Sequence, residues 1–263
     1  MADANLDLVV DHIHKLAGAP AAGDATDGQL LERFATTPEE TAFAALLQRH
    51  GPLVLGVCRR VLRHSHDAED VFQATFLLLA RKAHSIRKPE SLAGWLHGVA
   101  YRLAVRARAA AACRRAHERR AADRPRTEPA FDPAWQELLA VLDEELRRLP
   151  EKYRSPLVLC YLEGKTQEEA ARQLGWPLGT VRGRLARARE QLHTRLTRRG
   201  LTLSAGALAT ALPAPSVPGA VPATLLGATL KAALPFATGR GAAVTTSAAT
   251  LLAEEGLRAV SAG

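Results

Sequence analysis

The chain has 263 residues, a formal net charge of +8 and a pI of about 9.9, so it has room for one large domain or two small ones. The excess of basic residues favours a polyanionic partner over an acidic small substrate. Cys58, Cys113 and Cys160 lie far apart, which argues against paired zinc ligands and a disulfide framework and favours a reducing cytosol.

The N-terminal residues 1–27 contain one short amphipathic stretch, Leu6 to Leu16, followed by a linker of small residues. Acidic residues stand where a signal peptide needs basic ones, so we expect no secretion signal and a cytoplasmic protein. His12 and His14 are two residues apart, which places them on different faces of a helix and argues against a metal site.

Four helical patterns, and no strand pattern, follow in residues 28–112. The first covers 30–34, and the second covers 39–63 with a break or bend expected near Gly51-Pro52. The third covers 67–83, and the fourth begins near Ser91.

The third pattern has an informative second face. One face is apolar, and the other is formed by Asp70, Gln73, Ala74, Leu77, Ala80 and Arg81. An outward Leu77 among small residues suggests a packed partner, although a single exposed leucine is common on protein surfaces.

The fourth pattern also predicts an outward face, consisting of His97, Tyr101, Val105 and Arg108 with Arg102 beside them. A tyrosine flanked by arginines suits stacking on an unpaired base. A surface tyrosine without a role is the alternative. Residues 106–128 are rich in Ala and Arg and indicate the end of a helix that runs into a basic, flexible linker.

Two further helices are expected at 133–149 and 151–163, and a pair of short helices follows in Lys165–Leu192. Thr166 and Glu169 fit a capping box at the start of the first short helix. That helix should end at Gly175, with Pro177 preventing its continuation. We expect Thr180 to cap the second short helix.

The second short helix has one apolar stripe and one basic surface. The apolar residues are Val181, Leu185, Ala188 and Leu192, and the opposite face carries Gly183, Ala186, Arg187 and Glu190. Arg182 and Arg189 lie on one flank and Arg184 on the other. Small residues and arginines would allow close approach to a DNA major groove, whereas a solvated basic face is the plainer interpretation. The capped helix, the glycine turn and the basic helix together favour DNA binding.

From Leu201 onward the chain is rich in Ala, Leu and Pro and carries little charge. Its prolines interrupt any run of the roughly 20 residues that a transmembrane helix needs. We expect disorder with short helices, and leave membrane contact open.

Three stretches, in this order, resemble the extracytoplasmic-function (ECF) sigma factors of bacterial RNA polymerase. DAEDVFQATFLLLARKA at 67–83 is similar to the polymerase-docking helix of region 2, and SLAGWLHGVAYRLAVRARA at 91–109 is similar to its strand-opening helix. LPEKYRSPLVLCYLEGKTQEEAARQLGWPLGTVRGRLARAREQL at 149–192 is similar to region 4.

The resemblance implies an all-α fold of two small helical domains joined by a flexible basic linker, with a low-complexity tail. The expected parts are an N-terminal extension at 1–27, region 2 at 28–112, the linker at 113–132, region 4 at 133–200 and the tail at 201–263. It also implies a sigma factor that binds core RNA polymerase and directs promoter recognition, melting and initiation. A stand-alone helix-turn-helix regulator is the alternative, but it leaves the similarity of 67–109 unexplained.

The resemblance assigns three sets of site residues. Positions for the upstream promoter element are Thr180, Arg182, Gly183, Arg184, Ala186, Arg187 and Arg189. Positions for the melted element are Arg87, Lys88, Ser91, Trp95, Tyr101 and Arg102, where Trp95 fits a structural role equally well. Positions for core polymerase are Asp70, Gln73, Phe76, Leu77 and Ala80.

The expected partners are therefore core RNA polymerase and promoter DNA, with an anti-sigma factor or a membrane contact of the tail left open. No strand-turn-helix nucleophile, phosphate loop or paired metal ligands stand in the sequence, so we expect no enzymatic activity, cofactor or metal.

Overall fold

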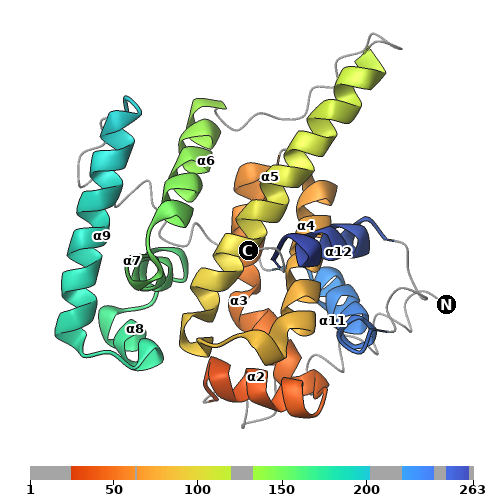
Figure 1. The fold of residues 1–263 in the computed structure, drawn as a ribbon, viewed down its shortest axis with the longest axis horizontal. Coiled ribbons are helices and arrows are strands. Elements are labelled where there is room, and N and C mark those ends of the chain that lie inside the picture. Colours follow the sequence, from red (N-terminus) through yellow and green to blue (C-terminus); the bar gives the residue numbers. More distant parts are fainter. Residues whose placement is uncertain (1–24, 63, 120–132, 202–220, 240–246, 261–263) are drawn as a thin grey trace.

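The computed structural model describes residues 25–62, 64–119, 133–201, 221–239 and 247–260. Within these ranges all regular structure is helical, which confirms the all-α prediction. Figure 1 shows two groups of helices side by side: a first lobe of α2 to α5 with α11 and α12, and a second lobe of α6 to α9. The amphipathic stretch at 6–16, its two histidines and residues 120–132 of the predicted linker lie outside the described residues.

The first lobe follows the predicted helical patterns. Its helices are α2 (Asp27–Thr36), α3 (Glu40–Val61), α4 (Ser65–Lys82) and α5 (Leu92–Arg119), with two single 3₁₀ turns, η1 (Ala83–Ser85) and η2 (Pro89–Ser91), between α4 and α5. Helix α3 continues through Pro52, so no break occurs there; proline removes only one backbone hydrogen bond, and the buried faces on either side hold the helix together.

Helix α5 is longer than predicted. It reaches Arg119 and so crosses the expected domain boundary at 112. The run of alanines and arginines after Leu103 has high helix propensity, which explains why the helix persists where we expected a linker.

Aromatic side chains gather in the core of the first lobe. The ring centroids of Phe34 and Phe43 are 4.6 Å apart, and those of Phe72 and Phe76 are 5.0 Å apart. Phe43 and Phe76 meet edge to face at 6.4 Å and join the two pairs across α3 and α4. A chain with few aromatic residues thus concentrates them at one point, where large apolar surfaces contribute most to packing.

The second lobe consists of α6 (Pro133–Arg148), α7 (Glu151–Leu157), α8 (Gln167–Leu174) and α9 (Leu178–Arg198). The wide turn η3 (Val158–Leu162) continues α7 with the π-type bond from the Glu163 N–H to the Val158 carbonyl, 3.0 Å. The buried leucines of the second lobe form a second core, which also includes Leu53 of α3 and Ala93 of α5. The two lobes therefore pack against each other through apolar as well as polar contacts.

Two helices of the tail, α11 (Ala223–Ala237) and α12 (Ala248–Val260), pack against α4 in the first lobe (Figure 1). Leu225, Leu230, Ala233 and Phe236 of α11 and Ala253 of α12 are buried in the core of this lobe. Short helices were expected in the tail, and these two are present; what the sequence did not predict is that they pack into the core of the first lobe. None of the helices in the described ranges combines the length and apolar character required to cross a bilayer.

Candidate nucleic-acid and polymerase interfaces

Helix α8, which precedes the turn, begins and ends as predicted. The Thr166 hydroxyl accepts a hydrogen bond from the Glu169 N–H, and the Glu169 carboxylate accepts one from the Thr166 N–H at 2.8 Å, which completes the capping box. Gly175 ends α8 in the left-handed region, with φ of 64°, and the Trp176 N–H donates to the Ala171 carbonyl at 3.0 Å. A residue with a side chain is strained at this φ, so the glycine sets the angle between the two helices.

The predicted cap of α9 is wrong. The helix begins at Leu178 with Pro177 as its N-cap, and Thr180 lies inside the first turn, its N–H donating to the Pro177 carbonyl at 2.9 Å. The fixed φ of proline prepares the chain for helical geometry, so no side-chain cap is needed.

The two faces of α9 are those that its periodicity predicts. Val181, Leu185, Ala188 and Leu192 are buried in the second core. The face formed by Arg182, Gly183, Ala186, Arg187 and Glu190 is exposed. A Cβ atom added at Gly183 would meet nothing within 4 Å, so this part of the surface is open to close approach by a ligand.

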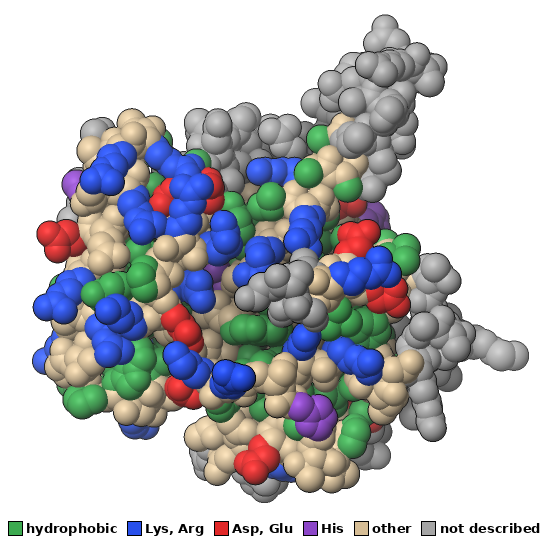
Figure 2. Space-filling model, viewed as in Figure 1, with side chains coloured by type: hydrophobic (Ala, Val, Ile, Leu, Met, Phe, Trp, Pro, Cys, Tyr) green, Lys and Arg blue, Asp and Glu red, His purple; other side chains and the backbone are tan. Residues whose placement is uncertain are grey.

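The arginines of α9 differ in whether their guanidinium groups already contact other residues of the chain. Arg182 lies 3.4 Å from the Glu168 carboxylate, and the Arg184 guanidinium stacks 4.0 Å from the centre of the Trp176 ring. Arg189 makes a long hydrogen bond of 3.4 Å to the Leu185 carbonyl. Arg187 makes no ion pair or hydrogen bond within the described ranges and is the most available of the four for an external anion. Figure 2 shows Lys and Arg side chains gathered over the part of the molecule that contains α9.

The residues assigned to the melted element divide into exposed and covered ones. Arg87, Lys88 and Arg102 are exposed, Trp95 is half-buried against the first core, and Ser91 is buried at the end of η2. Lys88 lies 3.4 Å from the Glu151 carboxylate across the lobes, a pair that is open to solvent on both sides.

The outward orientation predicted for Tyr101 and His97 is wrong in this arrangement. Tyr101 is 8% exposed, with the Arg147 guanidinium of α6 5.8 Å from its ring centre. Burial, together with the negative charge of Glu144 and Asp143, raises the pKa of Tyr101. His97 is fully buried, and its Nε2 lies 3.1 Å from Asp143 Oδ1. Helix α6 covers the part of this α5 face that carries Tyr101 and His97, because charged side chains of the two lobes pair there, whereas Arg108 is exposed as expected.

The residues assigned to core polymerase lie along α4, and most of them are covered. Phe76 belongs to the first core, as its position in the apolar pattern indicated. Leu77 and Ala80 are 1% and 3% exposed, so the expected outward face is buried. Asp70 and Gln73 remain half-buried near the start of the helix, and burial raises the pKa of the Asp70 carboxyl. The packed partner that Leu77 suggested is present: the tail helices α11 and α12 lie against α4.

A carboxylate of the second lobe joins two helices of the first. Asp143 of α6 accepts a two-point hydrogen bond from Arg60 of α3, at 2.8 and 3.0 Å, besides its contact with His97 of α5. Burial raises the pKa of Asp143, but the Arg60 charge and the hydrogen bonds to both partners outweigh it and hold the pKa at about 2. The carboxylate is therefore charged at neutral pH and well compensated.

A second polar junction is centred on His50 of α3. Its Nδ1 lies 2.7 Å from a Glu163 oxygen of the second lobe, and its Nε2 lies 3.0 Å from Asp27 of α2. Gln173 of α8 donates to the same Asp27 carboxylate at 3.0 Å. Neither junction was predicted from the sequence, because the residues that form them lie far apart in the chain. The available signal was a polar residue, His50, at a position in the apolar stripe of its helix.

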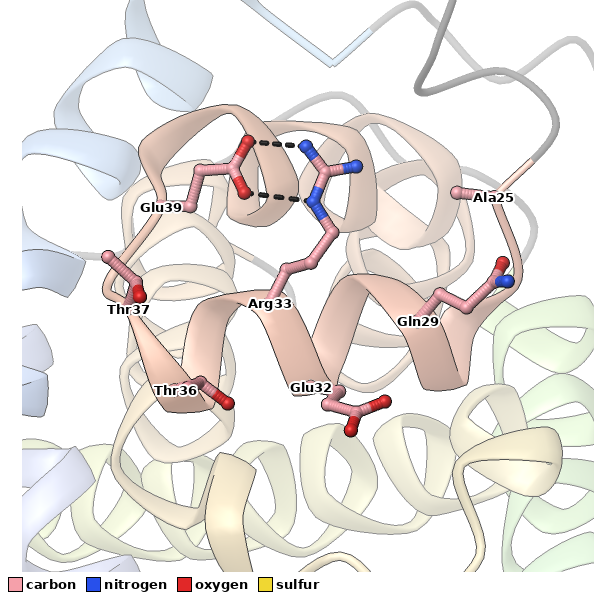
Figure 3. Close-up of a pocket in the computed structure, with 7 residues that line it drawn as sticks. All are labelled: Ala25, Gln29, Glu32, Arg33, Thr36, Thr37 and Glu39. Atoms are coloured by element: carbon pink, nitrogen blue, oxygen red, sulfur yellow. Dashed lines mark hydrogen bonds and ion pairs between the residues drawn. The ribbon is translucent and has the colours of Figure 1, made fainter.

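A shallow hollow lies between α2 and the start of α3 (Figure 3). The Arg33 Nε donates to the Glu39 carboxylate at 2.8 Å across it, so the positively charged side chain that lines the hollow is already paired. None of the predicted site residues lines this hollow. Within the described ranges no group of three or more His, Cys, Asp or Glu side chains has the geometry to hold a metal ion.

Comparison with known proteins matches both lobes. The profile of "Sigma-70 region 2" matches residues 46–114, and that of "Sigma-70, region 4" matches residues 139–192. Neither profile reaches the tail helices.

Two curated relatives give the extent of the likeness. The ECF RNA polymerase sigma factor SigM of Mycobacterium tuberculosis is 32% identical over 168 residues, which span 64% of this chain and 83% of SigM. The ECF RNA polymerase sigma factor SigE of Mycolicibacterium smegmatis is 33% identical over 174 residues, which span 63% of this chain and 66% of SigE. The solved complex of the sigma factor RpoE with the anti-sigma factor NepR from Bartonella quintana aligns at 22% identity and a TM-score of 0.28, over 58% of this chain and 94% of that chain.

Proposed function

Because the chain belongs to the ECF sigma factors of the sigma-70 family, we propose that it binds core RNA polymerase and directs it to promoter DNA, where it supports strand opening and initiation. The observation that carries the proposal is the presence of region 2 and region 4 in one chain, in that order. A stand-alone helix-turn-helix regulator would account for residues 139–192 but not for the match over 46–114.

For the upstream element we propose that α9 enters the major groove of duplex DNA with its exposed face. Arg182 and Arg187 would contact base edges beside Gly183 and Ala186, whose small size allows close approach. Thr180, Arg184 and Arg189 lie at the flanks, where contacts to phosphates position the helix without reading sequence.

For the melted element we propose that the exposed cations Arg87, Lys88 and Arg102 hold the backbone of the opened strand, with Ser91 and Trp95 beside them. Tyr101 would stack on an unpaired base, which requires α6 to move away from α5, since Arg147 covers the ring. The bases captured in this way would offset an unstacking cost of a few kcal/mol.

For core polymerase we propose the α4 residues Asp70, Gln73, Phe76, Leu77 and Ala80, of which Phe76 supports the helix from within the core. The family acts by binding and, in general, not by catalysis of its own, and we propose the same for this chain, without a cofactor. Because both proposed partners are cytoplasmic in bacteria, we propose that the chain acts in the cytoplasm. An anti-sigma factor is a further candidate partner of the same surfaces.

Competition for core polymerase tests this proposal. Purified core enzyme is loaded with a labelled sigma factor from the same bacterium, and the full-length chain is titrated against it. The proposal expects displacement of the labelled sigma factor. DNA binding without any displacement would contradict it and would favour a conventional regulator.

A further inference from the structure

Helix α4 is buried on every side from its middle to the last turn. The seven consecutive residues from Ala74 to Ala80 are all buried. Seven residues make almost two turns of an α-helix and point in every direction around its axis. Something must therefore cover this helix on all sides.

The cover comes from two parts of the chain. Helices α3 and α5 of region 2 lie against one side of α4, and the tail helices α11 and α12 lie against another (Figure 1). The tail contact is close: a Cβ atom added at Gly256 of α12 would stand 2.7 Å from the Leu78 Cδ1 and 3.2 Å from a methyl of Leu103. Only a residue without a side chain lets α12 approach α4 and α5 this closely.

Polar and apolar contacts also hold α11 in place. Arg81, near the end of α4, donates to the Ala237 carbonyl at the end of α11, 3.0 Å away. Val221, just before α11, stands 3.2 Å from the position of a Cβ atom at Gly51 of α3. The polar Thr229, which is fully buried, satisfies its own hydroxyl by donating to the Leu225 carbonyl at 2.6 Å. The helix is thus fitted to its site without an unpartnered polar group at Thr229.

The covered residues include two of those proposed to bind polymerase. Leu77 and Ala80 are almost inaccessible in this arrangement. Leu77 lies one turn before Arg81, which bonds to α11, so the two residues share the side of α4 that faces the tail. Another protein can reach this side only if the tail helices leave. The tail lies outside both sigma-70 profiles, so its removal leaves the parts that define the family in place.

We propose that α11 and α12 are an intramolecular cover for the α4 face that core polymerase binds, and that tail and polymerase compete for this face. The proposal rests on the proposed sigma function. The apparent affinity for polymerase is then reduced by the fraction of molecules in which the tail is released. A variant that weakens the cover without touching α4 should bind polymerase more tightly.

Two alanines of α11 offer a matched pair. Ala233 is 0% exposed in the core of the first lobe, whereas Ala228 on the same helix is exposed. Ala233→Glu and Ala228→Glu make the same change of size, charge and helix propensity. Only Ala233→Glu places a carboxylate in an apolar contact, where an unpaired charge is strongly disfavoured.

The measurement is the affinity of each full-length protein for purified core RNA polymerase. We expect Ala233→Glu to bind at least about tenfold more tightly than the wild type, and Ala228→Glu to match the wild type. Gly256→Leu, which forces α12 away from Leu78, should act in the same direction as Ala233→Glu. If the wild type, Ala233→Glu and Gly256→Leu all bind with equal affinity, the proposal that the tail covers the polymerase-binding face is wrong, and the sigma function is left intact. Failure of every protein to bind polymerase would instead overturn the sigma function.

A second measurement uses only the wild type and does not depend on how the variants fold. Amide hydrogen exchange is followed in the free protein and in its complex with core polymerase. We expect amides of α11 and α12 to lose protection in the complex while those of α4 stay protected. Continued protection of both tail helices in the complex would show that the cover is not displaced and would overturn the proposal.

Discussion

Arg187 is exposed on α9, and within the described part of the chain its guanidinium makes no ion pair or hydrogen bond. A two-point contact between an arginine and a guanine edge contributes about 1–3 kcal/mol of discrimination. We therefore expect Arg187→Ala to weaken binding to the upstream element by roughly 10- to 100-fold relative to scrambled DNA, with core binding unchanged.

The neighbouring Arg184 gives the comparison for this prediction. Its guanidinium stacks on Trp176, so Arg184→Ala should weaken binding to specific and scrambled duplexes alike, as loss of a phosphate contact does. Fluorescence anisotropy with the two duplexes separates the cases. If Arg187→Ala also loses the same factor on both duplexes, Arg187 contacts phosphates and does not read the sequence.

His50 makes the stability of the lobe junction depend on pH. Burial alone lowers the pKa of a histidine, but the charges of Glu163 and Asp27 and the hydrogen bonds to both raise the pKa of His50 to about 9. The raised pKa means that the charged imidazole stabilises the folded state. This contribution is fully present below the ordinary pKa of 6.5 and is lost as pH rises toward 9.

Asp27 sets the lower limit of the pH range in which this junction stabilises the folded state. Burial raises the pKa of this carboxyl, but the charge of His50 and the hydrogen bonds from His50 and Arg49 outweigh it and lower the pKa to about 2. Its contribution is present above the ordinary pKa of 3.8 and is lost as pH falls toward 2. The junction should therefore be most stable between about pH 4 and 6.5.

Urea unfolding at pH 6.5 and pH 9 tests this window. We expect the wild type to lose up to about 3 kcal/mol of unfolding free energy between these values, and His50→Gln, which cannot titrate, to lose less. A pH profile that is the same for the wild type and His50→Gln would contradict the role assigned to the imidazole.

At the scale of the element, two glycines near the start of α9 have opposite requirements. Gly175 has φ of 64° and closes α8, whereas Gly179 lies in the first turn of α9 at a position where a Cβ atom would meet nothing within 4 Å. Gly175→Ala should cost about 1 kcal/mol or more of unfolding free energy, because an alanine is strained in the left-handed region. Gly179→Ala should instead add about 0.5–1 kcal/mol, because alanine lowers the entropy of the unfolded chain.

Thermal unfolding of the two variants tests whether their unfolding free energies change in opposite directions. Matching shifts for Gly175→Ala and Gly179→Ala would contradict the assignment of Gly175 as the residue that sets the turn. The same variants separate geometry from stability in DNA binding, since only Gly175→Ala should change the angle at which α9 is held.

The elements themselves could be predicted to a large degree. The period of the apolar residues gave α4 and α9 their positions and buried faces, and the capping box and Gly175 marked the limits of α8. Thr180 was wrongly expected as a cap, because the helix begins two residues earlier, at Leu178, with Pro177 at the N-cap position. Local patterns are informative where the deciding contacts are local.

At the scale of the whole molecule, Asp143 holds the second lobe against α3 and α5. Removing one partner of a buried ion pair costs about 3–5 kcal/mol, because the other charge stays without compensation. We expect Asp143→Ala to separate the lobes, increase the radius of gyration in X-ray scattering and make Tyr101 accessible to solvent. The reason is that Arg60 and His97 lose the carboxylate they share.

The adjacent carboxylate provides the control. Glu144 pairs with Arg148 and Arg199, both within the second lobe, at 2.7 and 2.8 Å. Glu144→Ala should therefore leave the lobes together and cost no more than about 1 kcal/mol. An unchanged radius of gyration for Asp143→Ala would show that the apolar contacts of Leu53 and Ala93 hold the lobes without the ion pair.

The relation between the lobes and the tail could not be predicted from sequence. Leu77 and Tyr101 were expected to be exposed because each lies outside the apolar stripe of its own helix. The tail helices lie against α4, the helix that carries Leu77, and Arg147 of α6 lies over the ring of Tyr101. The residues that decide these contacts, Gly256 and Asp143, are ordinary in their local context and lie far along the chain from what they cover. Periodicity describes one helix at a time and says nothing about such partners.

The most direct measurement of the central claim is transcription by purified core RNA polymerase on fragmented genomic DNA, with and without this protein, followed by mapping of the new start sites. The account predicts discrete new starts that share two spaced upstream motifs, and more product from Ala233→Glu than from the wild type. Sequence-specific DNA binding without any new start, for either protein, would contradict it.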